Sequence, residues 1–384
     1  MIPLSVPVLN GNEWKYIKEC LDTNWVSSAG KFVDTFEAKI AEYTGSKYAI
    51  ACVNGTSALH ISLLLAGVKP GDEILIPTLT FIAPVNAIRY AGADPLFMDA
   101  DEYYNIDVQK VLEFIENETS FRNDSTYNNN TGKRISAIIP VHVFGNAVNL
   151  DPVMELLHER NIQIIEDATE SLGTRYIEGT YSGKHSGAIG DLGCISFNGN
   201  KIITTGGGGM ILTDNESLAI RARYLTTQAK DNDVYFIHND IGYNYRLTNI
   251  QAALGVAQIE QLPDFLRIKK KNFELYTKKI LEIDGLDIAD SPHYADNNHW
   301  MYPLKIDTAV YRRSRDELIT HLSQVGIQTR PVWHLNHLQK PYAGYFSYRI
   351  ECALHLLEQT INLPCSVNLK DEDIDIVFKA LCYE

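Results

Sequence analysis

Short runs of apolar, often β-branched residues recur along the first 215 residues or so. They cover residues 47–53, 73–77, 95–99, 136–143, 163–166, 193–197 and 210–213. Their apolar residues are continuous and do not alternate with polar ones, which indicates strands buried on both faces of a sheet. Segments with helical spacing lie between them, for example residues 57–66 and 153–160. This alternation predicts an α/β domain with a seven-stranded, mostly parallel sheet, and its site should lie in the loops at the strands' carboxyl ends.

The rest of the chain predicts a second, smaller α/β domain. Residues 248–281 have a helical pattern with Pro263 inside it, where we expect a kink or break. Strand-like residues 300–306 follow. Ser314 and Glu317 then have capping-box spacing and open a helix to Leu322, and Gly326 ends it before strand-like residues 327–332. We expect a large domain over residues 1–250 and a small C-terminal domain over residues 251–384.

Residues 118–133 interrupt this alternation. The stretch is polar and rich in asparagine, and it ends at Thr131-Gly132. It predicts a surface loop inserted before a buried strand, without a catalytic role.

Net charge narrows the possible partners. The chain has 34 Lys and Arg against 48 Asp and Glu, a net charge of −14. It therefore lacks the general basic field that binds nucleic acid or an anionic membrane, and an anionic ligand must be held by local groups. The N-terminus lacks the basic start of a signal peptide, and no apolar run is long enough to span a bilayer. The six cysteines are scattered without a C-x-x-C pair. We expect a cytoplasmic protein without disulfides or a metal site.

The segment Asn54-Gly55-Thr56-Ser57 follows a predicted strand and opens a predicted helix. Free amides at a helix N-terminus attract anions, Gly55 lets the backbone approach closely, and the two hydroxyls add donors. The segment therefore predicts a phosphate seat, and an ordinary N-cap turn is the alternative. No Walker loop occurs in the chain.

Asp167 and Lys201 carry the chemistry of the next two motifs. Asp167 ends a buried strand, where a carboxylate needs a cationic partner such as a protonated pyridine nitrogen; a helix cap is the alternative. Lys201 lies between a buried strand and the run Gly206–Gly209, which suits covalent use as a Schiff base; an exposed loop lysine is the alternative. In a fourth motif, residues 242–246, Asn244 and Arg246 could hold a phosphate or a carboxylate.

Together, the four motifs resemble those of the PLP-dependent sugar-nucleotide aminotransferases of the DegT/DnrJ family, over residues 7–364. The resemblance implies a fold-type-I (aspartate aminotransferase-like) enzyme with pyridoxal 5′-phosphate (PLP) as its cofactor. It implies that Lys201 carries the cofactor and moves the protons of both half-reactions, and that Asp167 pairs with the ring nitrogen. Among the other cofactor-binding positions, it implies that Phe81 stacks on the ring, that Glu170 lies near the 3′-oxygen, and that the phosphate is held by Thr56, Ser57, Ser196 and Asn244.

The family reaches the phosphate with its Asn244 equivalent from the neighbouring subunit, so the resemblance also implies a homodimer with shared active sites. Trp333, together with His334 and His337 beside it, matches the substrate-facing segment. A nucleotide-linked substrate carries a diphosphate, and the available cations near the motifs are Lys31, Lys184, Arg246 and Arg330. For the two lysines, a solvated surface position is the alternative.

Two positions depart from the common family pattern and resemble the legionaminic-acid (LegC-type) branch. Glu170 stands where Gln or His is frequent, and Gly206–Gly209 stands where Gly-Glu-Gly-Gly is frequent. This branch implies transfer of the amino group of L-glutamate to C4 of a nucleotide-linked 4-keto-6-deoxy-N-acetylhexosamine, in the biosynthesis of a bacterial surface sugar. The alternatives are a sugar-nucleotide-binding or regulatory protein that retains the fold, and 3-amination of a 3-ketosugar. A nicotinamide dehydrogenase does not fit, because no G-x-G-x-x-G follows the first strand.

Overall fold

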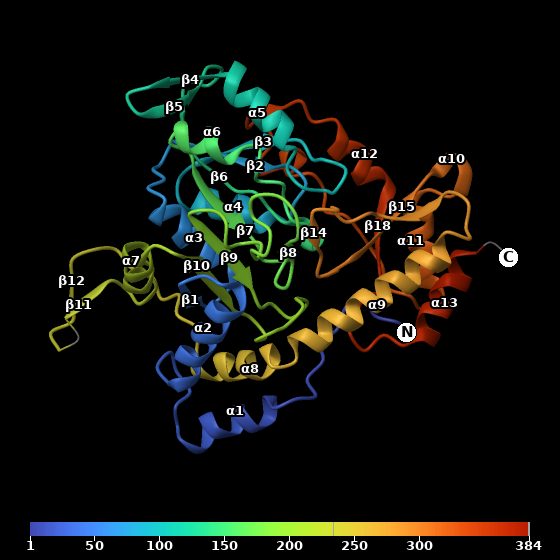
Figure 1. Cartoon of the computed structure of the whole chain (residues 1–384), viewed down its shortest axis with the longest axis horizontal. Helices are drawn as coiled ribbons and strands as arrows, with labels where there is room; N and C mark the ends of the chain where they lie inside the picture. Colours follow the sequence, from blue (N-terminus) through green and yellow to red (C-terminus); the bar gives the residue numbers. More distant parts are fainter. Residues whose placement is uncertain (233, 383–384) are drawn as a thin grey trace.

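The computed structural model describes residues 1–232 and 234–382, and its centre is one large sheet (Figure 1). The strand order is β1-β10-β9-β7-β6-β2-β3-β17. The strands are β1 (Tyr48–Cys52), β2 (Glu73–Pro77), β3 (Asp94–Met98), β6 (Arg134–Ile138), β7 (Gln163–Asp167), β9 (Leu192–Ser196), β10 (Gly209–Thr213) and β17 (Ser347–Tyr348). Only β10 runs against its neighbours in this row. All seven predicted strands are confirmed, and so is the mostly parallel sheet, but the predicted count of seven strands is too low, because β17 adds an eighth strand beside β3 in this row.

The prediction of a surface loop over residues 118–133 is wrong. This stretch forms a hairpin of β4 (Thr119–Arg122) and β5 (Ser125–Asn128), and β5 pairs with β6, so the whole sheet has ten strands. Asn123 and Asp124 have φ angles of 51° and 53° at its turn. Asn and Asp tolerate this left-handed conformation, which a tight two-residue hairpin turn requires. Two of the polar residues that suggested a loop, Asn123 and Asp124, therefore form the turn between the two strands.

Helices cover both faces of the sheet because neighbouring strand residues point to opposite sides. Ile74 and Ile76 belong to one core with α3 (Gly55–Leu65), α4 (Ile82–Tyr90) and α7 (Glu216–Thr226), whereas Leu75 belongs to another with α5 (Val108–Asn117) and α6 (Met154–Glu159). A third core lies between the β1 end of the sheet and α1 (Glu13–Asp22), α2 (Lys31–Thr44) and α8 (Asn249–Ile259).

A second, antiparallel sheet lies to one side, in orange and red in Figure 1. Its strand order is β13 (Leu286–Ile288), β15 (Tyr302–Ile306), β18 (Thr360–Leu363), β16 (Arg330–Pro331). The helices around it are α9 (Leu262–Ile280), α10 (Thr308–Tyr311), α11 (Arg315–Gln324), α12 (Cys352–Gln359) and α13 (Asp371–Leu381). The long helix α9 links this sheet to the large body.

Three predictions in this half have clear outcomes. The predicted break in the helical run is present, because α8 ends at Ile259 and α9 begins at Leu262. Pro263 lies in the first turn of α9, where a main-chain N–H would have no partner within the helix. The Ser314–Glu317 capping box is present at the start of α11. Of the strand-like residues 327–332, only Arg330 and Pro331 form a strand.

Two segments pair with the part of the fold that is distant from them in the sequence. The N-terminal segment pairs with the second sheet's surroundings, since Ile2 bridges Ile327 and the amide of Cys365 donates to Leu4 O. Conversely, β17 joins the large sheet beside β3. The boundary at residue 250 stays a prediction. In the described ranges, no helix combines the length and the apolar character needed to cross a lipid bilayer.

Candidate active site

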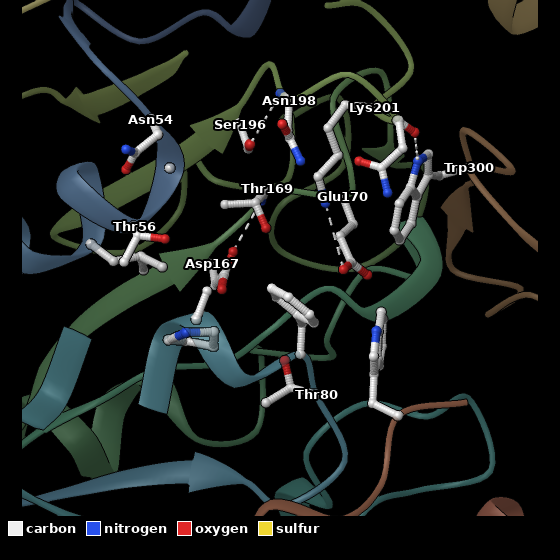
Figure 2. Close-up of a pocket in the computed structure, with 17 residues that line it drawn as sticks. Asn54, Thr56, Thr80, Asp167, Thr169, Glu170, Ser196, Asn198, Lys201 and Trp300 are labelled. Atoms are coloured by element: carbon white, nitrogen blue, oxygen red, sulfur yellow. Dashed lines mark hydrogen bonds and ion pairs between the residues drawn. The ribbon is translucent and has the colours of Figure 1, made fainter. Parts of the chain in front are cut away.

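A cavity of about 310 Å³ lies at the carboxyl ends of β7 and β9, beside the N-terminus of α3 (Figure 2). Parallel strands place their carboxyl ends at the same edge, so loops from distant parts of the sequence meet there. Seven of the predicted site residues line this cavity: Thr56, Phe81, Asp167, Glu170, Ser196, Lys201 and Trp333.

The N-terminus of α3 is built to face an anion. Asn54 caps the helix, because its Oδ1 accepts the amide of Ser57 at 2.8 Å. The amides of Gly55 and Thr56 lie in this first turn, between Asn54 and Ser57, and donate to no acceptor within the described residues. A Cβ added to Gly55 would lie 2.9 Å from the Cβ of Ser196, so only glycine lets the helix approach β9 this closely. These features fit a bound phosphate group.

The glycine run after Lys201 supports the same loop. A Cβ added to Gly209, the first residue of β10, would lie 2.4 Å from the carbonyl oxygen of Asn54. Glycine at this position therefore allows the phosphate seat to rest directly on the backbone of β10. This gives the end of the run Gly206–Gly209 a packing role that the sequence did not reveal.

Asp167 ends β7 with its carboxylate buried beneath the cavity, 2% exposed. Its Oδ1 accepts the amide of Thr169 at 3.1 Å. Burial raises the pKa of Asp167 above its ordinary value. A buried carboxylate of this kind is stabilised by a cationic partner, and a protonated pyridine nitrogen would be one.

Glu170 lies on the other side of the cavity, next to Lys201. Its Oε1 is 3.7 Å from Lys201 Nζ, and its Oε2 accepts the amide of Phe144 at 2.9 Å. Burial raises the pKa of Glu170 to about 7. A large fraction of this carboxyl group is therefore protonated at neutral pH, and in that form it can donate a hydrogen bond to an anionic oxygen.

Aromatic rings close the cavity on the side of the second sheet. Phe144 has a φ of 58°, and its ring stacks on Trp333 with the centroids 5.1 Å apart. Trp333 also faces Phe81, with 6.4 Å between the ring centroids. The amide of Phe144, which Glu170 binds, thus connects a cavity carboxyl group to the aromatic wall.

The structure does not bring the four proposed substrate cations to this cavity. Lys31 pairs with Glu19 on the surface, and Lys184 lies on an exposed turn. Arg246 donates to Glu37 Oε1 at 2.6 Å, with only 9% of its side chain exposed, so it stabilises a buried carboxylate. Arg330 is exposed on β16. Their roles toward a substrate stay predictions.

The remaining predicted residues are distributed as follows. Ser57 uses its amide for the helix cap, and the residue is 7% exposed. Asn244 is exposed and outside the cavity. His334 is exposed, whereas His337 Nδ1 is 2.6 Å from the hydroxyl of Thr78 and burial lowers the pKa of this histidine. Within the described residues, no cluster of His, Cys, Asp and Glu could hold a metal ion.

Sequence reasoning missed several lining residues. Thr80, Ala83, Pro84, Thr169, Asn198, Asn200 and Trp300 all line the cavity. Most lie within a few residues of Phe81, Asp167 or Lys201, and this proximity along the chain could have revealed them. Trp300 gives no such signal, because about 100 residues separate it from Lys201.

The fold and the site define a PLP-dependent aminotransferase of fold type I. The chain belongs to the DegT/DnrJ/EryC1/StrS aminotransferase family, whose sequence pattern matches residues 7–382. It is similar to the GDP-perosamine synthase of Caulobacter vibrioides, with 39% identity over 99% of this chain and 97% of the relative. It is also similar to the GDP-perosamine synthase of Escherichia coli O157:H7, with 36% identity over 99% of this chain and 97% of that protein.

Solved structures agree with this assignment. The aminotransferase TlmJ of Streptoalloteichus hindustanus has a TM-score of 0.88 at 27% identity, over 99% of this chain and 98% of that one. DesI, solved with its TDP-sugar product, has a TM-score of 0.86 at 25% identity, over 99% and 91% of the two chains. The chain is therefore a sugar aminotransferase that uses PLP, as the resemblance implied. The legionaminic-acid branch is not confirmed.

Proposed function

We propose that this enzyme transfers the amino group of L-glutamate to C4 of a nucleotide-linked 4-keto-6-deoxyhexose. The observation that carries the chemistry is the single cavity in which Lys201, Asp167 and the N-terminus of α3 meet. The full-length similarity to two GDP-perosamine synthases favours a GDP-linked sugar and GDP-perosamine as the product. It favours this over the N-acetylhexosamine of the legionaminic-acid branch.

The residues present fit PLP. The free amides at the start of α3, with Thr56 and Ser196, would hold its phosphate, and Asp167 would keep its ring nitrogen protonated. Bound PLP supplies an electron sink for the electron pair of the C–H bond that is broken. Glu170, in its protonated form, would donate to the 3′-oxygen, which removes the repulsion between two anionic oxygens.

Lys201 would perform the proton transfers. Its Nζ reaches into the cavity and is 13% exposed at the side chain, so bulk water competes little for its proton. In the first half-reaction it would take the proton from Cα of glutamate, and in the second it would deliver one to C4 of the sugar. We further propose a cytoplasmic homodimer, in which the exposed Asn244 serves the neighbouring subunit's phosphate.

The experiment is an amination assay with glutamate and two acceptors, GDP-4-keto-6-deoxymannose and a UDP-linked 4-keto-6-deoxy-N-acetylhexosamine. We expect turnover with the GDP-linked sugar and an amino group at C4 of the product. Turnover with only the UDP-linked sugar would restore the legionaminic-acid branch. Amination at C3, or binding without turnover, would contradict the proposal.

A pair of lysine variants tests the role of Lys201. Lys201→Ala should lose both the yellow colour of the lysine-bound cofactor and all turnover. Lys278→Ala removes an exposed lysine from α9 and should change neither property. If Lys201→Ala keeps a comparable rate, Lys201 is not the base.

A further inference from the structure

Trp300 lies two residues before the start of β15 and is 4% exposed, and three hydrogen bonds hold it. Its indole N–H donates to the carbonyl oxygen of Asn200 at 2.7 Å. Its main-chain N–H donates to Asn298 Oδ1 at 2.9 Å, and its carbonyl oxygen accepts from Lys269 Nζ at 2.8 Å. The three partners come from separate parts of the chain, so the plane of the ring is set by the tertiary structure.

The face of this ring carries Lys201. Nζ of Lys201 is 4.1 Å from the ring centroid of Trp300, and the two side chains lie side by side at one end of the cavity (Figure 2). An ammonium group is attracted by the electron-rich face of an indole within about 6 Å, most strongly where water is excluded. The other ionisable groups lining the cavity are Asp167 and Glu170, and Glu170 Oε1 lies 3.7 Å from the same Nζ.

Lys269 supports Trp300 from behind. It is 3% exposed on α9, and it donates to the carbonyl oxygens of Trp300 and of Cys365, the latter at 2.6 Å. Nζ of Lys269 also lies over the ring of Tyr302, 4.7 Å from its centroid. No carboxylate pairs with it within the described residues.

The position of Lys269 has an energetic consequence. Burial lowers the pKa of Lys269, because a charge without an opposite charge is unfavourable in the protein interior, and a methionine of similar length would fill the space without that penalty. Lys269 Nζ instead binds two carbonyl oxygens from different segments, those of Trp300 and Cys365. The Nζ group of Lys269 therefore ties the backbone of Trp300 to that of Cys365.

We propose that Trp300 is a positioning residue for proton transfer by Lys201, and that Lys269 holds Trp300 in place for this role. This rests on the proposed function of Lys201 as the base. If the amine of Lys201 takes the proton from Cα of glutamate, bound PLP would accept the electron pair of that C–H bond, and a positive charge would form on Nζ. The indole face lies where this charge forms, and it also retains the amine inside the cavity.

The test uses the holoenzyme and stopped-flow measurement of the glutamate half-reaction. Trp300→Leu removes the aromatic face, and we expect a half-reaction about 10- to 30-fold slower, since a desolvated cation–π contact has about this effect. The acid limb of its pH profile should move about one unit lower, because the ammonium form of Lys201 loses its stabilisation. Trp300→Phe keeps a face and should lie between wild type and Trp300→Leu.

Lys269→Met tests the support, with Lys270→Met as its matched control. Lys270 is the next residue of α9, but it is exposed and paired with Asp296. We expect Lys269→Met to remain folded and to reproduce part of the slower half-reaction and the moved acid limb, whereas Lys270→Met should behave as wild type.

Two outcomes would overturn the inference. One is a Trp300→Leu half-reaction within twofold of wild type with an unchanged acid limb. The other is a slower Lys269→Met half-reaction with an unmoved acid limb, which would make Lys269 merely structural. Failure of the proposed function is distinct, because the wild-type enzyme itself would then show no spectral change with glutamate.

Discussion

Replacing Glu170 by glutamine tests how the cavity controls its own protonation. Glu170 is buried at 5% exposure, and its pKa is raised to about 7 from an ordinary value of 4.5. The folded protein thus binds this proton more tightly than the unfolded chain does. Its stability contribution is fully present below pH 4.5 or so and is lost as the pH rises through about 7.

The size of the effect follows from the interval between the two pKa values. Each pH unit corresponds to about 1.36 kcal/mol, so the free energy of unfolding decreases by roughly 3 kcal/mol across the interval. Glutamine cannot ionise, and its oxygen can still accept the amide of Phe144. Glu170→Gln should therefore match wild type near pH 5 and exceed its stability by up to about 3 kcal/mol at pH 8.

The assay is scanning calorimetry of the cofactor-free enzyme at both pH values. For 384 residues the unfolding entropy is roughly 0.8 kcal/mol/K, so the expected gain in Tm at pH 8 is about 4 °C. Glu42→Gln, on the exposed side of α2, is the control for removing one surface charge. A Glu170→Gln Tm difference that is the same at pH 5 and pH 8 would refute the reasoning.

Three further changes have distinct expected results. Asp167→Asn should weaken PLP binding and slow turnover by about 100-fold or more, because the ring nitrogen loses its anionic partner; absorbance titration with PLP and steady-state rates measure this. Arg246→Ala should lower stability by about 3 kcal/mol and spare the KM for the sugar nucleotide, because it leaves Glu37 buried with a weaker partner; denaturant unfolding and kinetics separate the two. Asn244→Ala should raise the PLP dissociation constant only in the dimer, and sedimentation at several enzyme concentrations would show where the dimer is present. Equal PLP loss from a monomer would contradict the shared site.

Local pattern determined much of the architecture. The seven buried strands were predictable because continuous apolar runs between helical segments have few other stable arrangements. The break at Pro263 and the cap at Ser314 were predictable because each depends on backbone groups within a few residues. The hairpin at residues 119–128 was not predicted, because its polar segment becomes part of the sheet only when β5 pairs with β6, and the pattern of the segment alone does not show this pairing.

For the active site, the sequence identified the residues whose chemistry is tied to a strand end or a helix start. Asp167, Ser196 and Thr56 follow this rule, and all three line the cavity. Arg246 had the right chemistry, but the fold places it against Glu37, a pairing across 209 residues that no local pattern encodes. Trp300 had no recognisable motif, and only contacts between distant segments, such as its hydrogen bonds with Asn200 and Lys269, bring it to Lys201. Residue type and local spacing therefore determined which groups could react, and long-range packing decided which of them meet, because contacts between distant segments form only when the chain folds around a common apolar core.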